Sequence, residues 1–130
     1  ANYEGQTNAP RGEYTAIAVG SYHACGLQSD GAILCWGANY EGQTNAPRGE
    51  YTAIAVGSYH ACGLQSDGAI LCWGANYEGQ TNAPRGEYTA IAASGSKTCA
   101  VLKTDHSITC WGLTERAAVD TPIIEDTSEA

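Results

Sequence analysis

The chain has 130 residues, with 14 acidic against 6 basic side chains and a formal net charge of −8. This length allows one compact domain or a short array of repeats. We expect no nucleic-acid partner, because neutralising phosphates requires clustered Lys and Arg, and the six bases are spread thinly along the chain. No run of about 18 apolar residues is present, so we expect no membrane insertion.

Internal repetition dominates the sequence. Residues 1–37 form repeat 1, and residues 38–74 form repeat 2, which is identical letter for letter. Residues 75–112 form repeat 3, which is identical through Ala92, then diverges and gains one residue. Two perfect copies indicate either recent duplication or deliberate design, and the sequence leaves both open.

Each repeat carries a β pattern. Residues 14–19 alternate and are rich in Tyr, Thr and β-branched side chains, which favours a strand. Residues 23–28 and 32–36 flank a Ser-Asp-Gly turn, which predicts a hairpin with a three-residue loop. The Gly-, Asn- and Pro-rich stretch 37–49 predicts an irregular crossover with at most one short strand. Three to four antiparallel strands per repeat make a small twisted sheet that must stack on its neighbours.

The hairpin register places the cysteines in pairs. With a three-residue loop, Cys25 lies opposite Cys35 at a position where side chains approach closely. Repeat 3 has one more loop residue, and its register still brings Cys99 opposite Cys110. We therefore predict three disulfides, Cys25–Cys35, Cys62–Cys72 and Cys99–Cys110. Six cysteines at this spacing indicate an oxidising compartment, so we expect a secreted, extracellular or cell-surface protein.

A metal site is the competing interpretation of the same residues. His23, Cys25 and Cys35 would offer three soft ligands on one hairpin, and His60, Cys62 and Cys72 repeat them. Repeat 3 has no histidine at the matching place, and no CxxC motif occurs in the sequence. We therefore favour disulfides and expect no metal and no other cofactor.

The remaining polar residues favour structural roles. We expect His23 and His60 to be hydrogen-bonded structural or surface residues, and His106 to be solvated in a hairpin tip. Asp30 and Asp67 precede Gly in turns, which is ordinary hairpin chemistry. No nucleophile elbow, phosphate loop or metal triad is present, so we expect no catalysis.

The residues YTAIAVGSYHACGLQSDGAILCWGANYEGQ resemble the repeat of the regulator of chromosome condensation family, particularly its bacterial, cysteine-bearing branch. The matching features are the Gly-Ser-x-His-x-Cys segment, the Ser-Asp-Gly turn, the Cys-Trp-Gly strand end and Gly-Gln in the crossover. The repeats are also similar to those of propeller-type β-lactamase inhibitory proteins. The resemblance covers residues 1–112 and implies an all-β fold of tandem propeller blades, one per repeat, in an incomplete ring or spiral.

Self-assembly is the function we expect from such an array. Closed propellers need about four or more blades, so three blades leave two open faces that should be lined with small and apolar residues. The chain should then associate with itself into a ring or filament as an extracellular structural protein. Residues 1–13 have no preceding hairpin, and we expect them to complete the blade of a neighbouring chain.

The alternative is a module that binds an extracellular protein or a glycan, for example an enzyme inhibitor. Aromatic side chains would supply its surface, although Trp beside Gly is also typical of packing between blades. The candidate residues are Tyr3, Tyr22, Trp36, Tyr40, Tyr59 and Trp73.

Residues 113–130 form an acidic tail that matches no repeat. Its five acids against Arg116 give −4, which is half of the net charge of −8. We expect a solvated end or a cap that docks through Ile123 and Ile124, and no further blade.

Overall fold

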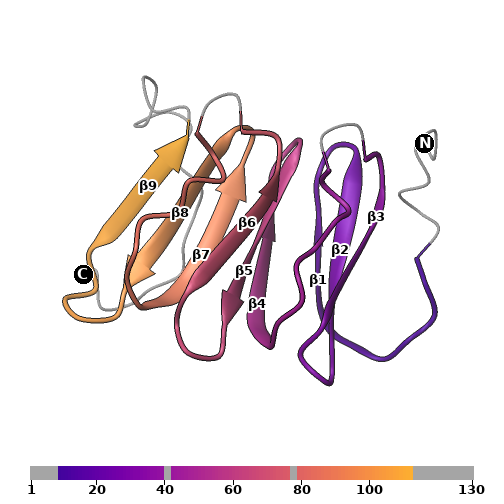
Figure 1. The fold of residues 1–130 in the computed structure, drawn as a ribbon, viewed down its shortest axis with the longest axis horizontal. Helices are drawn as coiled ribbons and strands as arrows, with labels where there is room; N and C mark the ends of the chain where they lie inside the picture. The colour runs from indigo at the N-terminus through magenta and orange to yellow at the C-terminus, as the bar shows by residue number, and fades with distance from the viewer. Residues whose placement is uncertain (1–8, 40–41, 77–78, 113–130) are drawn as a thin grey trace.

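The structure, a computed structural model, describes residues 9–39, 42–76 and 79–112 (Figure 1). In these ranges the chain is all-β, and none of them contains a helix that could cross a membrane. The strands are β1 (Tyr14–Val19), β2 (His23–Gln28), β3 (Ile33–Gly37), β4 (Tyr51–Val56), β5 (His60–Gln65), β6 (Ile70–Gly74), β7 (Tyr88–Ser94), β8 (Lys97–Leu102) and β9 (Ile108–Gly112).

The strands form three antiparallel three-stranded sheets in the order β1-β2-β3, β4-β5-β6 and β7-β8-β9. We call these sheets blade 1, blade 2 and blade 3. They follow one another in chain order across the molecule (Figure 1). The predicted all-β fold of stacked blades is confirmed, and each blade has three strands in the described residues. The third strand of blade 1 begins at Ile33, one residue later than predicted.

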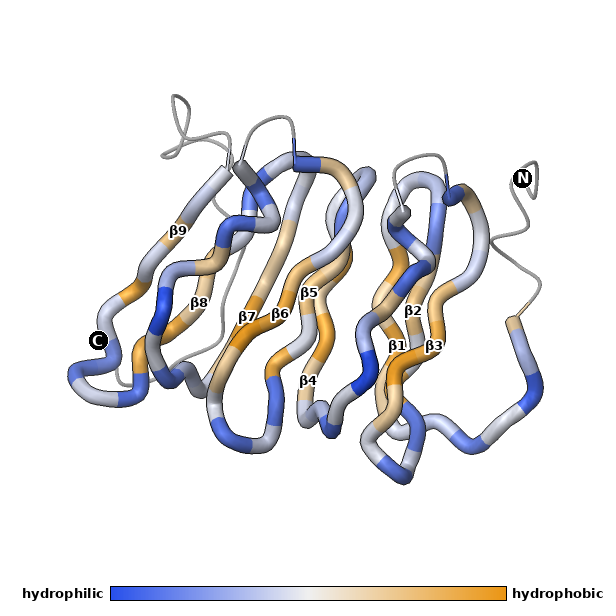
Figure 2. Tube along the Cα trace, viewed as in Figure 1, coloured by the Kyte–Doolittle hydropathy of each residue, from blue (hydrophilic) through white to orange (hydrophobic). Residues whose placement is uncertain are grey.

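The predicted hairpin register is confirmed in all three blades. Cys25 pairs with Cys35, Cys62 with Cys72 and Cys99 with Cys110. In blade 3 the longer loop is closed by a hydrogen bond from the amide of Leu102 to the carbonyl of Ser107 (2.9 Å), so the extra residue stays in the loop. Hydrophilic residues concentrate at the hairpin turns and hydrophobic ones along the strands (Figure 2).

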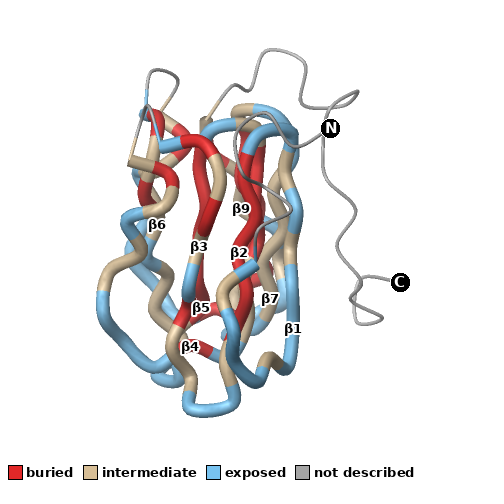
Figure 3. The backbone as a smooth tube through the Cα atoms, turned by 90° about the vertical axis from the view of Figure 1, so that its right-hand side faces the viewer, coloured by how far each residue is buried: buried red, intermediate tan, exposed pale blue. Residues whose placement is uncertain are grey.

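The core lies between blades, because each sheet is too small to enclose one. The middle strands are the most buried (Figure 3). One cluster joins blades 1 and 2, and a second joins blades 2 and 3. The clusters contain Cys25, Leu27, Ile33, Tyr51, Val56, Ala61 and Trp73, and then Leu64, Tyr88, Ala100 and Trp111.

The crossovers belong to the blade that follows them. Trp73 Nε1 donates to the carbonyl of Gln43 (3.0 Å), and Trp111 Nε1 donates to the carbonyl of Gln80 (2.8 Å). Tyr14 likewise donates from its hydroxyl to the carbonyl of Pro10 (3.0 Å) in its own chain. The expectation that residues 1–13 complete a neighbouring chain's blade stays a prediction. Residues 1–8 lie outside the described residues, as does the tail 113–130.

Candidate functional site

The two faces of each blade are the candidate site, because they are the surfaces on which blades recognise one another. We call the face toward the following blade the forward face and the other the rear face. The forward face of blade 1 carries Cys25, Leu27 and Ile33, which pack against the rear face of blade 2. That rear face is formed by Tyr51, Ile54, Val56, Ala61 and Trp73.

Glycine permits the close approach of neighbouring blades at the turn after the first strand. A Cβ atom at Gly20 would overlap the carbonyl oxygen of Gly57, and one at Gly57 would lie 2.6 Å from the carbonyl oxygen of Gly95. The amide of Ser58 donates to that same Gly95 carbonyl (3.0 Å), which joins blades 2 and 3. The turns of all three blades therefore converge, and they surround a depression of about 300 Å³.

Buried polar bonds run across both junctions. His23 Nε2 of blade 1 lies 3.2 Å from the carbonyl oxygen of His60 in blade 2, so this nitrogen donates. His60 Nε2 lies 2.8 Å from Thr98 Oγ1 of blade 3, and Thr98 Oγ1 donates onward to the carbonyl of Gln80 (3.2 Å). Since the threonine proton goes to Gln80, His60 Nε2 is also a donor. Both predicted histidines are thus structural links between blades.

Both histidines are held neutral. Burial lowers the pKa of His23, and its hydrogen bond to the His60 carbonyl offsets part of that effect. Burial, with a smaller contribution from a charge on His23, lowers the pKa of His60 to about 4. Both side chains are fully buried, and neither Nδ1 has a hydrogen-bond partner in the described part of the chain. The two rings are therefore inaccessible as bases for a substrate in solvent.

The rear face of blade 1 has no blade against it in the described residues. Val19 exposes 67% of its surface, whereas the equivalent Val56 of the identical repeat exposes 8%. Ile17 exposes 64%, and its equivalent Ile54 is half-buried. Tyr14 is half-buried as well. The difference between identical residues comes from the neighbour that blade 2 has and blade 1 lacks.

The predicted disulfides are present in the structure. Cys25–Cys35, Cys62–Cys72 and Cys99–Cys110 each join the second and third strands of a blade. Because these thiols are consumed, they offer no thiolates to the alternative zinc site. No group of three or more His, Cys, Asp or Glu that could hold a metal occurs in the described ranges.

The predicted aromatic surface divides into two groups. Tyr22 and Tyr59 stack on each other, with ring centroids 4.9 Å apart, and each exposes 40% of its surface. Trp36 and Trp73 are buried, so their place in a binding surface is corrected: they pack against Tyr14 and Tyr51 of their own blades. Tyr3 and Tyr40 lie outside the described residues.

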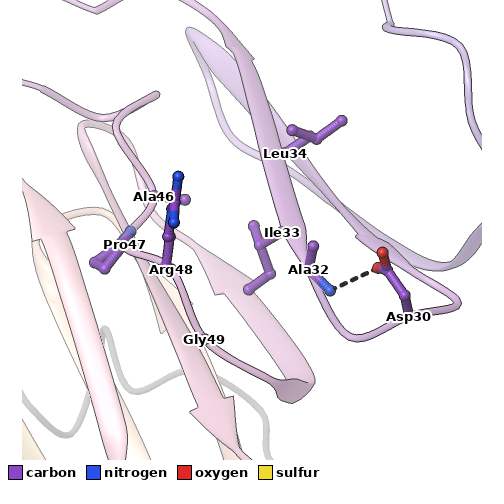
Figure 4. Close-up of a pocket in the computed structure, with 8 residues that line it drawn as sticks. All are labelled: Asp30, Ala32, Ile33, Leu34, Ala46, Pro47, Arg48 and Gly49. Atoms are coloured by element: carbon purple, nitrogen blue, oxygen red, sulfur yellow. Dashed lines mark hydrogen bonds between the residues drawn. The ribbon is translucent and has the colours of Figure 1, made fainter.

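A further groove of about 490 Å³ lies between the β2–β3 hairpin and the crossover into blade 2 (Figure 4). Its charged lining residues are Asp30 and Arg48. Asp30 Oδ1 accepts from the amide of Ala32 (3.0 Å), and Asp67 repeats this bond in blade 2. The carboxylates therefore close the hairpins, as expected of Asp before Gly.

Sequence reasoning missed three residues that matter at these faces: Ile17, Val19 and Lys97. The alternation of residues 14–19 places Ile17 and Val19 on one face of the first strand. The hairpin register places Cys25 on the opposite face of the sheet, so the two observations together would have identified the face of Ile17 and Val19 as the exposed one. Lys97 aligns with His23 and His60, so the alignment of repeat 3 already contained this signal.

Comparison with known proteins identifies the repeats. The family model "Regulator of chromosome condensation (RCC1) repeat" matches residues 14–43 and 51–80, which begin at the first strand of blades 1 and 2. These two segments are RCC1-type repeats. RCC1 repeats are propeller blades in the solved structures that resemble this one, so the three sheets are part of a propeller ring that they do not close. No curated protein matches the sequence significantly.

Two plant receptor ectodomains share this architecture. The ectodomain of the Physcomitrella patens receptor kinase CR4 is 32% identical over 82% of this chain and 31% of its own, with a TM-score of 0.73. The CRINKLY WD40 ectodomain of the Arabidopsis thaliana receptor kinase ACR4 is 29% identical over 77% of this chain and 37% of its own, with a TM-score of 0.68. Yeast RCC1 (Prp20), solved bound to Kap60, is 20% identical over 88% of this chain and 35% of its own, with a TM-score of 0.70, and shows the fold alone. The RCC1-repeat chain thus spans about a third of the length of these structures.

Proposed function

We propose that this chain is a non-catalytic RCC1-repeat module that acts outside the cytosol and docks a second copy of itself on the rear face of blade 1. The observation that carries the proposal is the exposure of Val19 (67%) against 8% for Val56. A side chain that is buried by a neighbouring blade in one repeat is bare in its identical copy. The exposed rear face of blade 1 therefore carries the same residues as the face of blade 2 that packs against a neighbouring blade.

The second copy is the favoured partner because the complementary surface recurs in the chain. Blade 2 receives the forward face of blade 1, whose apolar residues include Leu27 and Ile33. The equivalent positions of blade 3 are Val101 and Ile108, which are also apolar. Val101 is fully buried, and Ile108 exposes 43% of its surface. A forward face of one chain can thus meet the rear face of the next in a head-to-tail contact.

Burial of apolar surface drives this contact. Fully burying one Val or Ile contributes about 1.5–3 kcal/mol, and Ile17 and Val19 are both largely exposed. A heterologous contact of this kind closes into a ring if the rotation permits, and otherwise grows as a filament. Association through several such side chains offsets part of the entropic cost of bringing two chains together.

The disulfides support the proposed location, and the structural roles of the polar residues support a non-catalytic function. Three disulfides persist in oxidising compartments and are rare in the cytosol, which supports a secreted or cell-surface protein. The ring nitrogens of His23 and His60 serve the blade junctions, and Asp30 and Asp67 serve hairpin turns. We assign no catalytic step to any of them.

Sedimentation velocity on the full chain tests the proposal. Between about 1 and 200 µM, we expect the wild type to form species larger than the monomer, and Ile17→Asp with Val19→Asp to shift that association to at least tenfold higher concentration. Thr104→Asp adds the same kind of charge at an exposed hairpin tip and should leave association unchanged. A wild type that stays monomeric throughout, or a face variant that associates equally well, contradicts the proposal.

The stacked pair Tyr22 and Tyr59 supports a second candidate, recognition of a glycan. Two exposed, parallel aromatic rings 4.9 Å apart offer an apolar platform with hydroxyl groups at its edge. Binding to immobilised glycans should then weaken at least tenfold in Tyr22→Ala and Tyr59→Ala. Equal binding by the variants, or none by the wild type, rules out this candidate.

A further inference from the structure

Each described junction between blades seats an isoleucine against two aromatic rings. Ile33 of blade 1 packs in one cluster with Tyr51 and Trp73 of blade 2. A Cβ atom at Gly63 would lie 2.9 Å from Ile33 Cδ1, so glycine leaves the room that the isoleucine needs. The junction of blades 2 and 3 repeats this arrangement with Ile70, Tyr88 and Trp111. We call the isoleucine the knob and the pair of rings the socket.

Blade 1 has the same socket, and no knob fills it in the described residues. The rings of Tyr14 and Trp36 have centroids 6.2 Å apart at an angle of 58°, against 6.3 Å and 59° for Tyr51 and Trp73. The hydroxyl of each tyrosine donates to a proline carbonyl four residues earlier (3.0 and 2.9 Å). A hollow of about 310 Å³ lies beside Tyr14, Ile17 and Trp36. The socket is therefore preformed, which lowers the cost of binding a knob.

Blade 3 has a knob with no socket in front of it in the described residues. Ile108 pairs with Val101 across β8 and β9, as Ile33 pairs with Leu27 across β2 and β3. Ile108 exposes 43% of its surface, whereas Ile33 exposes 7%. The stack of three blades therefore has an open socket at one end and an open knob at the other.

A backbone hydrogen bond accompanies the knob at both junctions. The amide of Tyr51 donates to the carbonyl of Gly31 (2.8 Å), and the amide of Tyr88 donates to the carbonyl of Gly68 (2.8 Å). No hairpin loop precedes Tyr14 in the described residues, so its amide lacks this acceptor. The rear face of blade 1 thus presents a donor as well as a socket.

His106 supplies the matching acceptor in blade 3. It has a positive φ of 62°, as Gly31 has a φ of 92°. Its amide donates to the carbonyl of Leu102 (3.0 Å), as the amide of Gly31 donates to the carbonyl of Gln28 (2.9 Å). The carbonyl of His106 therefore lies where Gly31 presents its own, and no blade follows it in the described part of the chain.

The side chains beside the donor and the acceptor are also complementary. A Cβ atom at Gly68 would lie 3.1 Å from the Cβ atom of Glu87 in the next blade. His106 has a side chain at the position of Gly68, and Glu13 is the exposed counterpart of Glu87 in blade 1. An imidazole N–H donates to a carboxylate. The ends of the stack are therefore matched in apolar shape, hydrogen bonding and charge.

We propose that the segment His106–Ile108 of one copy docks on the rear face of blade 1 of the next copy. Ile108 enters the hollow beside Tyr14 and Trp36, and the carbonyl of His106 accepts from the amide of Tyr14. The inference rests on the proposed function and deepens it by naming the segment of the second copy that binds. Because knob and socket lie at opposite ends of the chain, the contact is head-to-tail and leaves one free end on each chain.

A mixture of two variants tests this pairing on the full chain. Ile108→Asp removes the knob and keeps the socket, whereas Ile17→Asp with Val19→Asp alters the socket and keeps the knob. In sedimentation velocity up to about 200 µM, each variant alone should associate only at a concentration at least tenfold higher than the wild type does. An equimolar mixture should form a heterodimer and stop there, because its two remaining ends are both blocked.

Leu71→Asp is the matched control. Leu71 exposes 37% of its surface on the edge strand β6 and belongs to neither junction cluster, so its replacement should leave association as in the wild type. Ile108→Val keeps a branched apolar knob and should associate more tightly than Ile108→Asp. Urea unfolding at about 1 µM establishes that each variant is folded, and Ile108→Ser replaces Ile108→Asp if the latter is not.

Nuclear Overhauser contacts in the mixture locate the knob directly. With isotope label on the chain that keeps Ile108, its methyl groups should show contacts to the Tyr14 ring of the unlabelled chain. A heterodimer without these contacts, or a mixture that remains monomeric while the wild type associates, overturns the pairing.

Two outcomes separate this inference from the proposed function. If Ile108→Asp associates like the wild type while the socket variant does not, the rear face still docks a second copy, and only the assignment of the knob is wrong. If the wild type itself stays monomeric up to about 200 µM, the proposed function fails together with the pairing.

Discussion

His60 Nε2 donates to Thr98 Oγ1 across the junction of blades 2 and 3, at a distance of 2.8 Å in a fully buried setting. Nε2 carries a proton in both the neutral and the charged imidazole, so it can donate this bond in either form. Burial, however, disfavours the charged ring. The burial of the His60 ring, which lowers its pKa, therefore makes the stability of the blade junction depend on pH.

Acid should therefore weaken the fold between pH 6.5 and about 4. Burial lowers the pKa of His60 from 6.5 to about 4. Between these two values the unfolded chain binds a proton on His60 and the folded chain does not. The free energy of unfolding therefore falls as pH falls. The loss reaches about 3 kcal/mol per such group. Urea unfolding at several pH values should show a shallower decline in His60→Gln than in the wild type.

His106→Gln is the control for that experiment. His106 lies exposed in the hairpin of blade 3, so its replacement removes an imidazole without disturbing a blade junction. Parallel declines in the wild type and in His60→Gln would show that the junction histidine does not titrate as described.

Gly57→Ala should destabilise the chain. The added Cβ would overlap the His60 ring of its own blade and lie 2.6 Å from the Gly95 carbonyl oxygen of blade 3, so the two blades must move apart. Overpacking of this kind costs about 1–3 kcal/mol. Gly95→Ala has open space around its Cβ and only a left-handed φ of 57° to maintain, so we expect a smaller loss by urea unfolding. The reverse order of the two losses would contradict this packing.

His106→Gly should stabilise the hairpin of blade 3. His106 has a φ of 62°, whereas the shorter hairpins use Gly31 and Gly68 at φ of 92° and 93°. Glycine adopts this conformation without steric cost, which should raise the free energy of unfolding by about 0.5–1 kcal/mol. A thermal or urea transition that moves to lower stability in His106→Gly argues against the left-handed conformation.

The disulfides should be complete in the mature protein. Intact mass under denaturing, non-reducing conditions should lie about six hydrogens below the reduced mass, because three bonds are present. Each bond closes a loop of about 11 residues and contributes about 3 kcal/mol on a chain-entropy estimate. Reduction should therefore unfold the chain at a lower urea concentration. Six titratable thiols in the untreated protein are incompatible with this account.

Most of the fold could be predicted from local features of the repeat. The alternation of residues 14–19 and the Ser-Asp-Gly turn determine the strands, and the loop length determines which cysteines face each other. Blade 3 was predictable for the same reason, since its extra residue falls in the loop and leaves Cys99 opposite Cys110.

The functional faces were harder to predict, because they depend on which residues meet across blades. Val19 and Val56 have the same local sequence, so only the arrangement of blades distinguishes an exposed side chain from a buried one. Trp36 and Trp73 were candidates for a binding surface as well as for packing, and their ring contacts with Tyr14 and Tyr51 decide for packing. The role of His60 likewise required the position of Thr98 on another blade.

The exposure of Val19 in solution tests the central claim most directly, with Val56 as the internal reference. Methyl resonances of the two valines can be followed with a soluble paramagnetic agent while the chain is concentrated from about 1 to 200 µM. The account predicts that relaxation of the Val19 methyls falls toward that of the Val56 methyls as chains dock on the rear face of blade 1. Val19 methyls that remain as accessible at the highest concentration as at the lowest would contradict it.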